Sequence, residues 1–155
     1  MAIVIATFCH SWTFFTFISY LPKYVNSPVS SGGLGVELES FLFIIMVLIP
    51  SIISVLSLLL GGYLADSFIK KGVKVIIVRK LANSLGFFGA ALCLFLIGFQ
   101  ENILNMIILL CITNLFSGIG AGGFGVNHAD LGPKYTGSLV GIAGGIGMIA
   151  AIISP

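Results

Sequence analysis

The sequence is poor in charge. Only 8% of its 155 residues are Asp, Glu, Lys or Arg, whereas a soluble domain contains about 25%. With 58% hydrophobic residues, such a chain cannot cover itself with a water-soluble surface, but it can be solvated by lipid. Intrinsic disorder is also excluded, because disordered segments combine low hydrophobicity with high charge.

Groups of residues that carry chemistry are scarce too. The three cysteines, Cys9, Cys93 and Cys111, lie in apolar stretches and have no CxxC or Cys/His metal spacing. No nucleophile–base pair, metal-ligand cluster or phosphate-binding glycine loop occurs, and no basic patch alternates with aromatic residues. The sequence therefore favours neither an enzyme nor a protein with a metal, a cofactor or a nucleic-acid partner.

What the sequence does contain is five uncharged apolar stretches. Each is long enough to cross a bilayer as a helix, which takes about 20 apolar residues. Because the runs are continuous, without polar alternation, helices are favoured over the strands of a membrane barrel. The predicted fold class is all-α, a polytopic membrane protein with five transmembrane helices at about 1–22, 41–65, 81–100, 102–127 and 135–155.

The charges between these stretches predict the orientation. Six of the seven basic residues fall either in the second loop, which runs from Asp66 to Lys80, or at Lys134 in the fourth loop. The first and third loops contain one basic residue, Lys23. The positive-inside rule then places loops two and four in the cytoplasm. An odd number of spans puts the two ends of the chain on opposite sides of the membrane. Because the sequence shows no tail beyond its first or last span, we expect this chain to be a piece of a larger helix bundle.

His10 is the only ionisable side chain deep within a stretch. Ionisable residues inside a membrane usually face the bundle interior or a water-filled path. A neutral imidazole is less costly to bury than a fixed charge, so a hydrogen-bonded core histidine is one interpretation. A role in proton or anion binding is the other, because the ordinary pKa of histidine, about 6.5, permits switching.

Glycines recur at a spacing of four in the last two stretches. Gly118 and Gly122 form one pair, and Gly137, Gly141 and Gly145 form a longer series. This spacing places each set on one helix face, where backbones can approach closely. The pattern predicts tight helix packing, and it is equally compatible with helices that rock against each other in a transporter.

Two loops contain clusters of polar residues. In loop two, Asp66 follows Gly62 and can accept hydrogen bonds from a helix N-terminus or pair with a base, although a solvated charged turn is the alternative. In loop four, His128, Asp130 and Lys134 lie together. They fit either ordinary helix capping or a gate or proton relay just beneath the membrane.

Four motifs resemble a known family. Residues 62–66 (GYLAD) with the lysines at 70–71 resemble the loop motif of the major facilitator superfamily. Residues 8–14 (FCHSWTF), 78–80 (VRK) and 123–135 (GFGVNHADLGPKY) are similar in order and spacing to its organic anion transporters. This family includes sialin, the vesicular glutamate transporters and the sodium–phosphate cotransporters. The resemblance covers essentially the whole chain and aligns it with helices 7–11 of a twelve-helix protein.

The resemblance implies alternating access between two six-helix halves, with a small organic anion or phosphate bound near the membrane midplane. It implies a coupling proton or sodium ion, the lipid bilayer and an N-terminal half of the same protein as partners. The substrate or proton pathway that it implies comprises His10, Trp12, Phe15, Asn127, His128 and Asp130. The cytoplasmic gating motif that it implies comprises Gly62, Asp66, Arg79, Lys80 and Lys134.

The sequence departs from the family pattern at several positions. His10 replaces the arginine of the glutamate-transporting branch, which indicates the sialin-like branch. Phe15 replaces a tyrosine, Lys134 replaces an arginine in the loop-four motif, and the pair Ala143-Gly144 replaces a polar Ser/Thr-Asn pair. These losses of polar groups are expected to weaken direct hydrogen bonding to an anion by the last helix.

The function predicted from these features is secondary active transport of organic anions, such as sugar acids, acidic amino acids or phosphate. The alternative is a multispan scaffold or assembly protein that does not transport and that associates through its glycine-rich helices. In either case we expect a multi-pass protein of a lysosomal, vesicular or plasma membrane.

Overall fold

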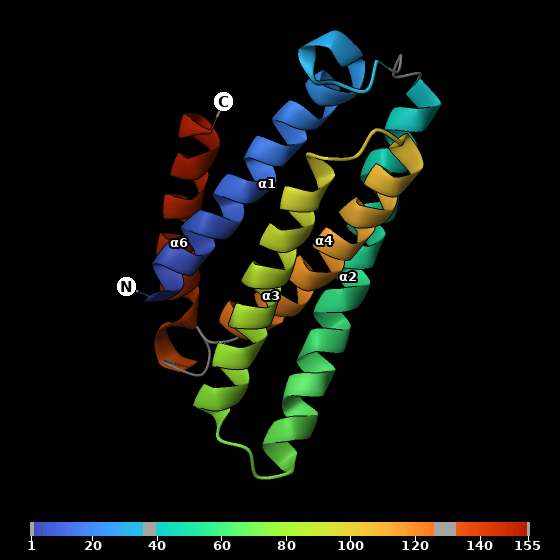
Figure 1. The fold of residues 1–155 in the computed structure, drawn as a ribbon. Coiled ribbons are helices and arrows are strands. Elements are labelled where there is room, and N and C mark those ends of the chain that lie inside the picture. The colour runs from blue at the N-terminus through green and yellow to red at the C-terminus, as the bar shows by residue number, and fades with distance from the viewer. Residues whose placement is uncertain (1, 36–39, 126–132, 155) are drawn as a thin grey trace. The chain divides into compact units, whose positions relative to one another are not determined.

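A computed structural model describes residues 2–35, 40–125 and 133–154 of the chain. Within these ranges all regular structure is helical, as Figure 1 shows. The elements are α1 (Ala2–Asn26), η1 (Val29–Ser31), α2 (Ser40–Lys70), α3 (Val75–Ile97), α4 (Ile103–Phe124), η2 (Pro133–Tyr135) and α6 (Thr136–Ile153). Five of these helices are long and apolar enough to cross a membrane, which confirms the predicted fold class.

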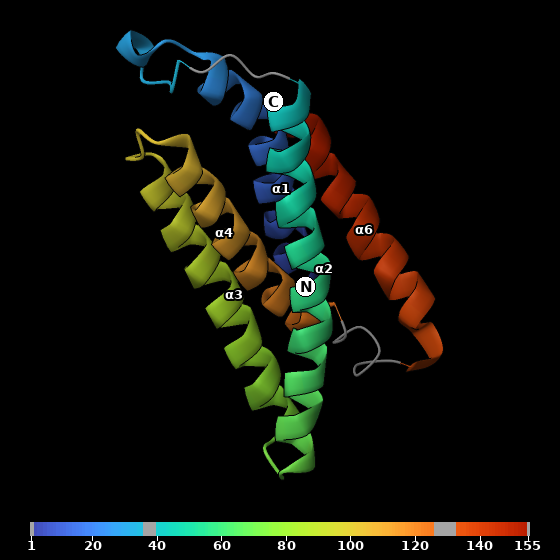
Figure 2. The same cartoon turned by 90° about the vertical axis from the view of Figure 1, so that its right-hand side faces the viewer.

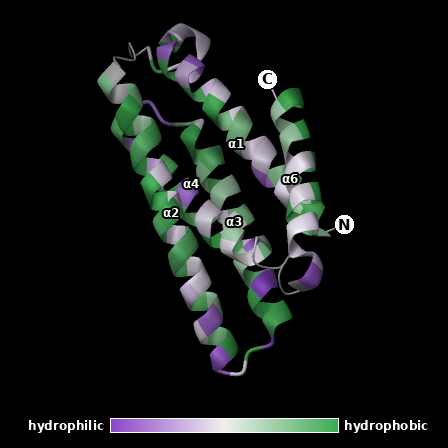
Figure 3. Cartoon of the chain, turned by 180° about the vertical axis from the view of Figure 1, so that it is seen from behind, coloured by the Kyte–Doolittle hydropathy of each residue, from purple (hydrophilic) through white to green (hydrophobic). Residues whose placement is uncertain are grey.

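The helices form two compact units. One contains α1, η1, the last residue of α4, η2 and α6, and the other contains α2, α3 and α4 as far as Gly123. Hydrophobic residues predominate along the helices (Figure 3), and many large apolar side chains are exposed in both units. Phe88 is 78% exposed and Ile152 is 83% exposed, an arrangement that suits lipid rather than water.

The second predicted loop is much shorter than the charges suggest. Asp66 and Lys70 lie in the last turns of α2, and Arg79 and Lys80 lie in the first turns of α3. The prediction that all these residues occupy a loop was therefore wrong. At 1.5 Å per residue, the 31 residues of α2 span about 46 Å. The helix is thus longer than the hydrocarbon core of about 30 Å, so its charged end extends beyond the core without ending the helix.

A left-handed glycine ends α2. Gly72 has φ of +90°, and its N–H donates to the carbonyl oxygen of Ile69 at 2.9 Å. The N–H of Val73 donates to the carbonyl oxygen of Phe68 at 3.1 Å. These bonds satisfy carbonyls at the helix end, and glycine permits the positive φ that this geometry needs. The chain then turns directly into α3, as Figure 2 shows.

In the unit of α2, α3 and α4, small residues let the helices approach closely. Gly118 of α4 lies against Ser57 of α2, whose side chain would overlap a Cβ at this position. On another face of α4, a Cβ at Gly86 of α3 would lie 2.5 Å from Cα of Gly120. Backbone therefore packs against backbone or hydroxyl at both contacts, which is how helices associate tightly in lipid. Met46 of α2 and Met106 and Leu110 of α4 are fully buried in the same unit.

In the other unit, α1 packs along α6. The residues on this face are small: Ala143, Gly147 and Ala150 of α6, and Ser154 directly after it. A Cβ at Gly147 would lie 2.8 Å from Oγ of Ser11 in α1. Farther along, the hydroxyls of Thr16 and Ser154 share a hydrogen bond of 2.8 Å. Close packing and one interhelical hydrogen bond thus hold the pair together.

Of the two glycine faces predicted to pack tightly, one lies at a helix contact and the other does not. Gly118 lies against Ser57, and a Cβ at Gly122 would lie 3.4 Å from the backbone between the two glycines of α2, so the α4 pair lies at a helix contact. Gly137, Gly141 and Gly145 do not, because a Cβ at any of them meets no atom of the described chain within 4 Å. The expectation of tight packing for that series was wrong within this unit, where the face that carries Gly147 makes the contact instead.

A matched pair of substitutions tests the α2–α4 contact. We expect Gly118→Ala to lower the free energy of unfolding by about 1–3 kcal/mol, because its methyl group overlaps Ser57. Gly62→Ala, in α2 of the same unit, meets no atom within 4 Å and should be neutral or stabilising by about 0.5–1 kcal/mol. Thermal unfolding of the detergent-solubilised protein, followed by circular dichroism, measures both changes. Equal stability of the two variants would contradict the contact.

Candidate functional site

His10 lies in the middle of α1 with its side chain half-buried. Its ring centroid is 5.4 Å from that of Phe124, the last residue of α4, at an interplanar angle of 57°. Helix periodicity places Thr7 and Thr13 one turn before and after it on the same side of α1. An ionisable group, two hydroxyls and an aromatic ring therefore line one stretch of this helix.

The threonines beside His10 bond to their own helix. Oγ1 of Thr7 donates to the carbonyl oxygen of Ile3 at 2.9 Å, and Oγ1 of Thr13 donates to that of Cys9 at 3.0 Å. Such bonds satisfy the hydroxyl protons where no water is present. Both hydroxyl protons are therefore used within α1 and are not donated to His10.

Trp12 and Phe15 share α1 with His10 but occupy other faces. At 3.6 residues per turn, Trp12 points about 200° around the helix from His10, and Phe15 points about 140° from it. The Trp12 ring lies 5.9 Å from that of Phe8, and the Phe15 ring lies 5.4 Å from that of Phe14. Each aromatic residue thus packs against a neighbour in its own helix, and the three predicted pathway residues of α1 do not gather at one point.

The remaining predicted pathway residues, Asn127, His128 and Asp130, lie outside the described residues. Lys134 is exposed in η2, where its Nζ lies 6.0 Å from the ring centroid of Tyr135. A cation over an aromatic face at this distance is weakly attracted to it.

Gly62 and Asp66 lie one turn apart near the end of α2. Asp66 is exposed, and Gly62 faces open space. The preceding residue, Gly61, makes the close contact instead, because a Cβ there would lie 3.1 Å from Cα of Ile119 in α4.

Arg79 is the buried member of the predicted gating motif. Its side chain is only 6% exposed, and Nη1 donates to the carbonyl oxygen of Gly122 at 3.2 Å. Since α4 ends at Phe124, this carbonyl is one of the last four of the helix, which lack intrahelical partners. The guanidinium supplies the missing donor and places positive charge at the negative end of the helix dipole. Its neighbour Lys80 is exposed.

Asn83, which the sequence reasoning passed over, lies one turn after Arg79 on α3. Its Oδ1 is buried and has no hydrogen-bond partner among the described residues. A Cβ at Gly123 would lie 2.8 Å from this oxygen. Arg79 and Asn83 therefore both face the last turn of α4. The sequence feature that could have identified Asn83 is an amide side chain in an apolar stretch, four residues after an arginine.

The site residues thus fall into two sets. His10, Trp12, Phe15 and Lys134 belong to the unit of α1 and α6, while Gly62, Asp66, Arg79 and Lys80 belong to the unit of α2, α3 and α4. The first set offers an intramembrane group that can carry a proton or donate to an anion. The second set stabilises a helix end next to a basic turn. Among the described residues, no group of three or more acidic, Cys or His side chains could hold a metal ion.

The chain is similar over its whole length to membrane transporters. It is 32% identical over 159 residues to vesicular glutamate transporter 3 of Danio rerio and 32% identical over 155 residues to vesicular glutamate transporter 1 of Bos taurus. It is 33% identical over 153 residues to probable anion transporter 2, chloroplastic, of Oryza sativa subsp. japonica. Each match covers 99% of this chain, and the chain spans about a quarter of each relative (25%, 26% and 27%). No family model matches the chain.

Five apolar helices of membrane-spanning length, together with this similarity, define a multi-pass integral membrane protein whose relatives are transporters. More particularly, the relatives that match the chain over its whole length are organic anion transporters of the major facilitator superfamily, the family that its motifs resemble. Its relatives are transporters rather than enzymes, in agreement with the prediction of a non-enzymatic protein.

The role of Arg79 at the end of α4 can be tested with its exposed neighbour as the control. We expect Arg79→Met to lower the free energy of unfolding by about 1–3 kcal/mol, because the carbonyl of Gly122 then remains buried without this donor. Lys80→Met should change it by no more than about 0.5 kcal/mol. Chemical or thermal unfolding in detergent measures both. If the Arg79 variant is as stable as the Lys80 variant, the hydrogen bond does not hold the helix end.

Proposed function

We propose that the protein transports organic anions across a membrane by alternating access and that this chain provides helices 7–11 of a twelve-helix fold. The observation that carries the proposal is the match of 99% of the chain to glutamate and anion transporters at about one-third identity. Because the chain spans about a quarter of those relatives, the opposite wall of a transport path belongs to parts of the protein outside this chain.

His10 is the residue that we propose to couple transport to protons or to bind the anion. It is the ionisable side chain within the membrane-spanning part of α1, and it is half-buried beside Phe124. A neutral imidazole is tolerated in such a place, and its protonated form can pair with a carboxylate or phosphate. The same residue can therefore serve as a proton carrier and as an anion ligand.

The substrate class is narrowed by what the last helix lacks. Where the family pattern has a polar pair, Ala143 is buried on the side of α6 that packs on α1, and Gly144 meets no described atom within 4 Å. Helix α6 therefore offers no side-chain hydrogen bond at these two positions. We propose that the anion is held by charge, with His10 as one contributor, and that sugar acids, acidic amino acids and phosphate are the candidate substrates.

Histidine in place of arginine at position 10 supports the sialin-like branch, with proton coupling and a lysosomal or vesicular membrane as the corresponding setting. The scaffold alternative has one feature in its favour, the open glycine face of α6. That face equally suits contact with a further helix of a transporter, so transport remains the better proposal.

Uptake by the product of the complete gene tests the function. We expect proteoliposomes to accumulate at least one of sialic acid, glutamate, aspartate or phosphate when an inward proton or sodium gradient is imposed. Collapse of the gradient with an ionophore should remove the accumulation. Failure of all four anions to move under any gradient would overturn the proposal in favour of the scaffold.

His10→Gln tests the coupling residue. If imidazole titration drives transport, we expect the pH dependence of uptake to flatten in this variant, because glutamine does not titrate. Thr13→Val removes a hydroxyl that bonds to its own helix one turn away and should leave the profile unchanged. A His10→Gln profile identical to that of the unmodified protein would assign His10 to packing against Phe124 alone.

A further inference from the structure

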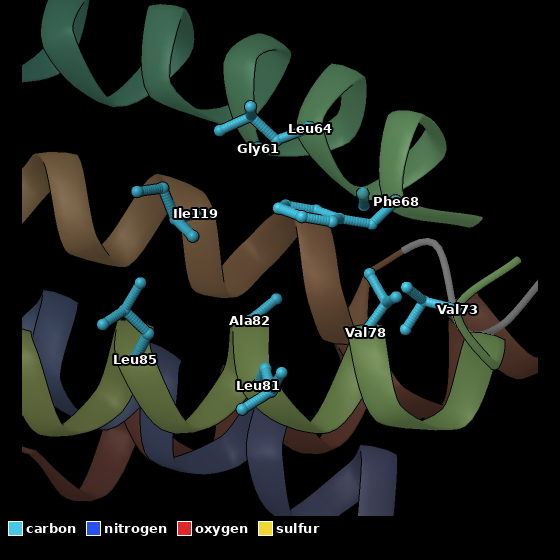
Figure 4. Close-up of a pocket in the computed structure, with 10 residues that line it drawn as sticks. Gly61, Leu64, Phe68, Val73, Val78, Leu81, Ala82, Leu85 and Ile119 are labelled. Atoms are coloured by element: carbon cyan, nitrogen blue, oxygen red, sulfur yellow. The ribbon is translucent and has the colours of Figure 1, made fainter. Parts of the chain in front are cut away.

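An apolar cavity opens between α2 and α3, in front of α4, at the end of the helices where the turn of residues 71–74 lies. Its volume is about 520 Å³, within the range of about 300–1,000 Å³ that is usual for small-molecule sites. Figure 4 shows side chains from all three helices and from the turn around it. They include Leu64 and Phe68 of α2, Val73 of the turn, Val78 and Leu81 of α3, and Ile119 of α4.

The lining explains which ligands the cavity can take. Every side chain that lines it is apolar, and the glycine and alanine residues among them widen it. A sugar acid, an amino acid or phosphate buried there would lose its hydration without gaining hydrogen bonds, at a large cost in free energy. The cavity is therefore unsuited to the proposed substrates, and a hydrocarbon chain is its natural occupant.

A cluster of exposed lysines surrounds the end of the cavity. Lys70 ends α2, Lys71 lies in the turn that follows, and Lys74 precedes α3. Val73 between Lys71 and Lys74 lines the cavity itself. Nζ of Lys71 lies 6.0 Å from the ring centroid of Phe68, whose ring also forms part of the wall. Asp66 is the acidic residue nearest to them in the sequence and is itself exposed. An apolar slot with ammonium groups at its end is complementary to a molecule that has a hydrocarbon tail and an anionic head.

We propose that this cavity binds an anionic phospholipid, with one acyl chain between α2 and α3 and the headgroup phosphate among Lys70, Lys71 and Lys74. Membranes supply such lipids at the level where helix ends meet water, and basic residues beside a membrane-spanning helix attract them. The site is separate from His10, which belongs to the other unit of the chain, and does not depend on whether the protein transports anions.

Competition between two lipids with identical acyl chains tests the headgroup preference. The product of the complete gene is purified in detergent and offered phosphatidylserine or phosphatidylcholine in mixed micelles, and the lipid retained is measured by native mass spectrometry. We expect preferential retention of phosphatidylserine that weakens as salt is raised, since salt screens exposed charges. Equal retention of both lipids, or a preference that salt does not change, would overturn the proposal.

Substitutions separate the two parts of the site. Replacing Lys70, Lys71 and Lys74 with glutamine should weaken phosphatidylserine binding by about fivefold for each lysine. Phosphatidylcholine binding should weaken less, because this lipid carries the same phosphate but no net charge. Val73→Phe puts an aromatic ring into the cavity from the turn and should weaken binding of both lipids. Lys23→Gln, in the other unit, and Val75→Phe, exposed at the start of α3 and not part of the wall, are the matched controls.

The outcome for Val73→Phe also distinguishes a lipid from a protein occupant. Lipid retention that is unchanged in this variant, together with a lower unfolding temperature or an altered oligomeric state, would mean that another helix of the protein or a second copy fills the cavity. That result would overturn the proposal. If Val73→Phe does not fold, the lysine variant, whose side chains are all exposed, still decides the question.

Discussion

The structure depends on how closely helix backbones can approach one another. In lipid, apolar surfaces gain little by meeting each other, because the tails of the lipid are as apolar as the side chains. Close van der Waals contact and hydrogen bonds must therefore hold the helices together. The contacts between Gly118 and Ser57, between Gly86 and Gly120, and between Gly147 and Ser11 meet this requirement, since a single added Cβ would collide with the neighbouring helix at each.

The same solvent determines how polar groups are treated. Hydroxyls in the helices donate to carbonyls of their own helix, as Thr13 and Thr113 do, or to a neighbour, as at Thr16 and Ser154. The guanidinium of Arg79 donates to an otherwise unpaired carbonyl at the end of α4. Charged side chains without such a partner lie at the helix ends, where the lysines of the α2–α3 turn are exposed. Helix ends therefore carry two kinds of cation. The guanidinium of Arg79 bonds within the protein, and the exposed lysines can contact an anion outside it.

The sequence predicted what composition and length determine, and less of what contact geometry determines. Five spans and the helix contact of Gly118 follow from apolar runs and from spacing, and both are present. Arg79 could not be placed, because a charge in a helix and a charge in a loop look alike when the hydrocarbon boundary is inferred from charge alone. Asn83 was missed for a related reason, since its spacing of four from Arg79 gains a meaning only when the end of α4 is seen beside both residues.

Helix α6 shows why spacing cannot identify the contact face by itself. Its glycines at 137, 141 and 145 and its small residues at 143, 147 and 150 both repeat at helical spacing, on different sides of the helix. Only the second set meets α1. A helix with one small-residue face occupied and another open is built for two close neighbours, or for one neighbour that changes. The alternating access that we propose requires helices whose faces are smooth enough to exchange contacts, and the composition of α6 is compatible with such movement.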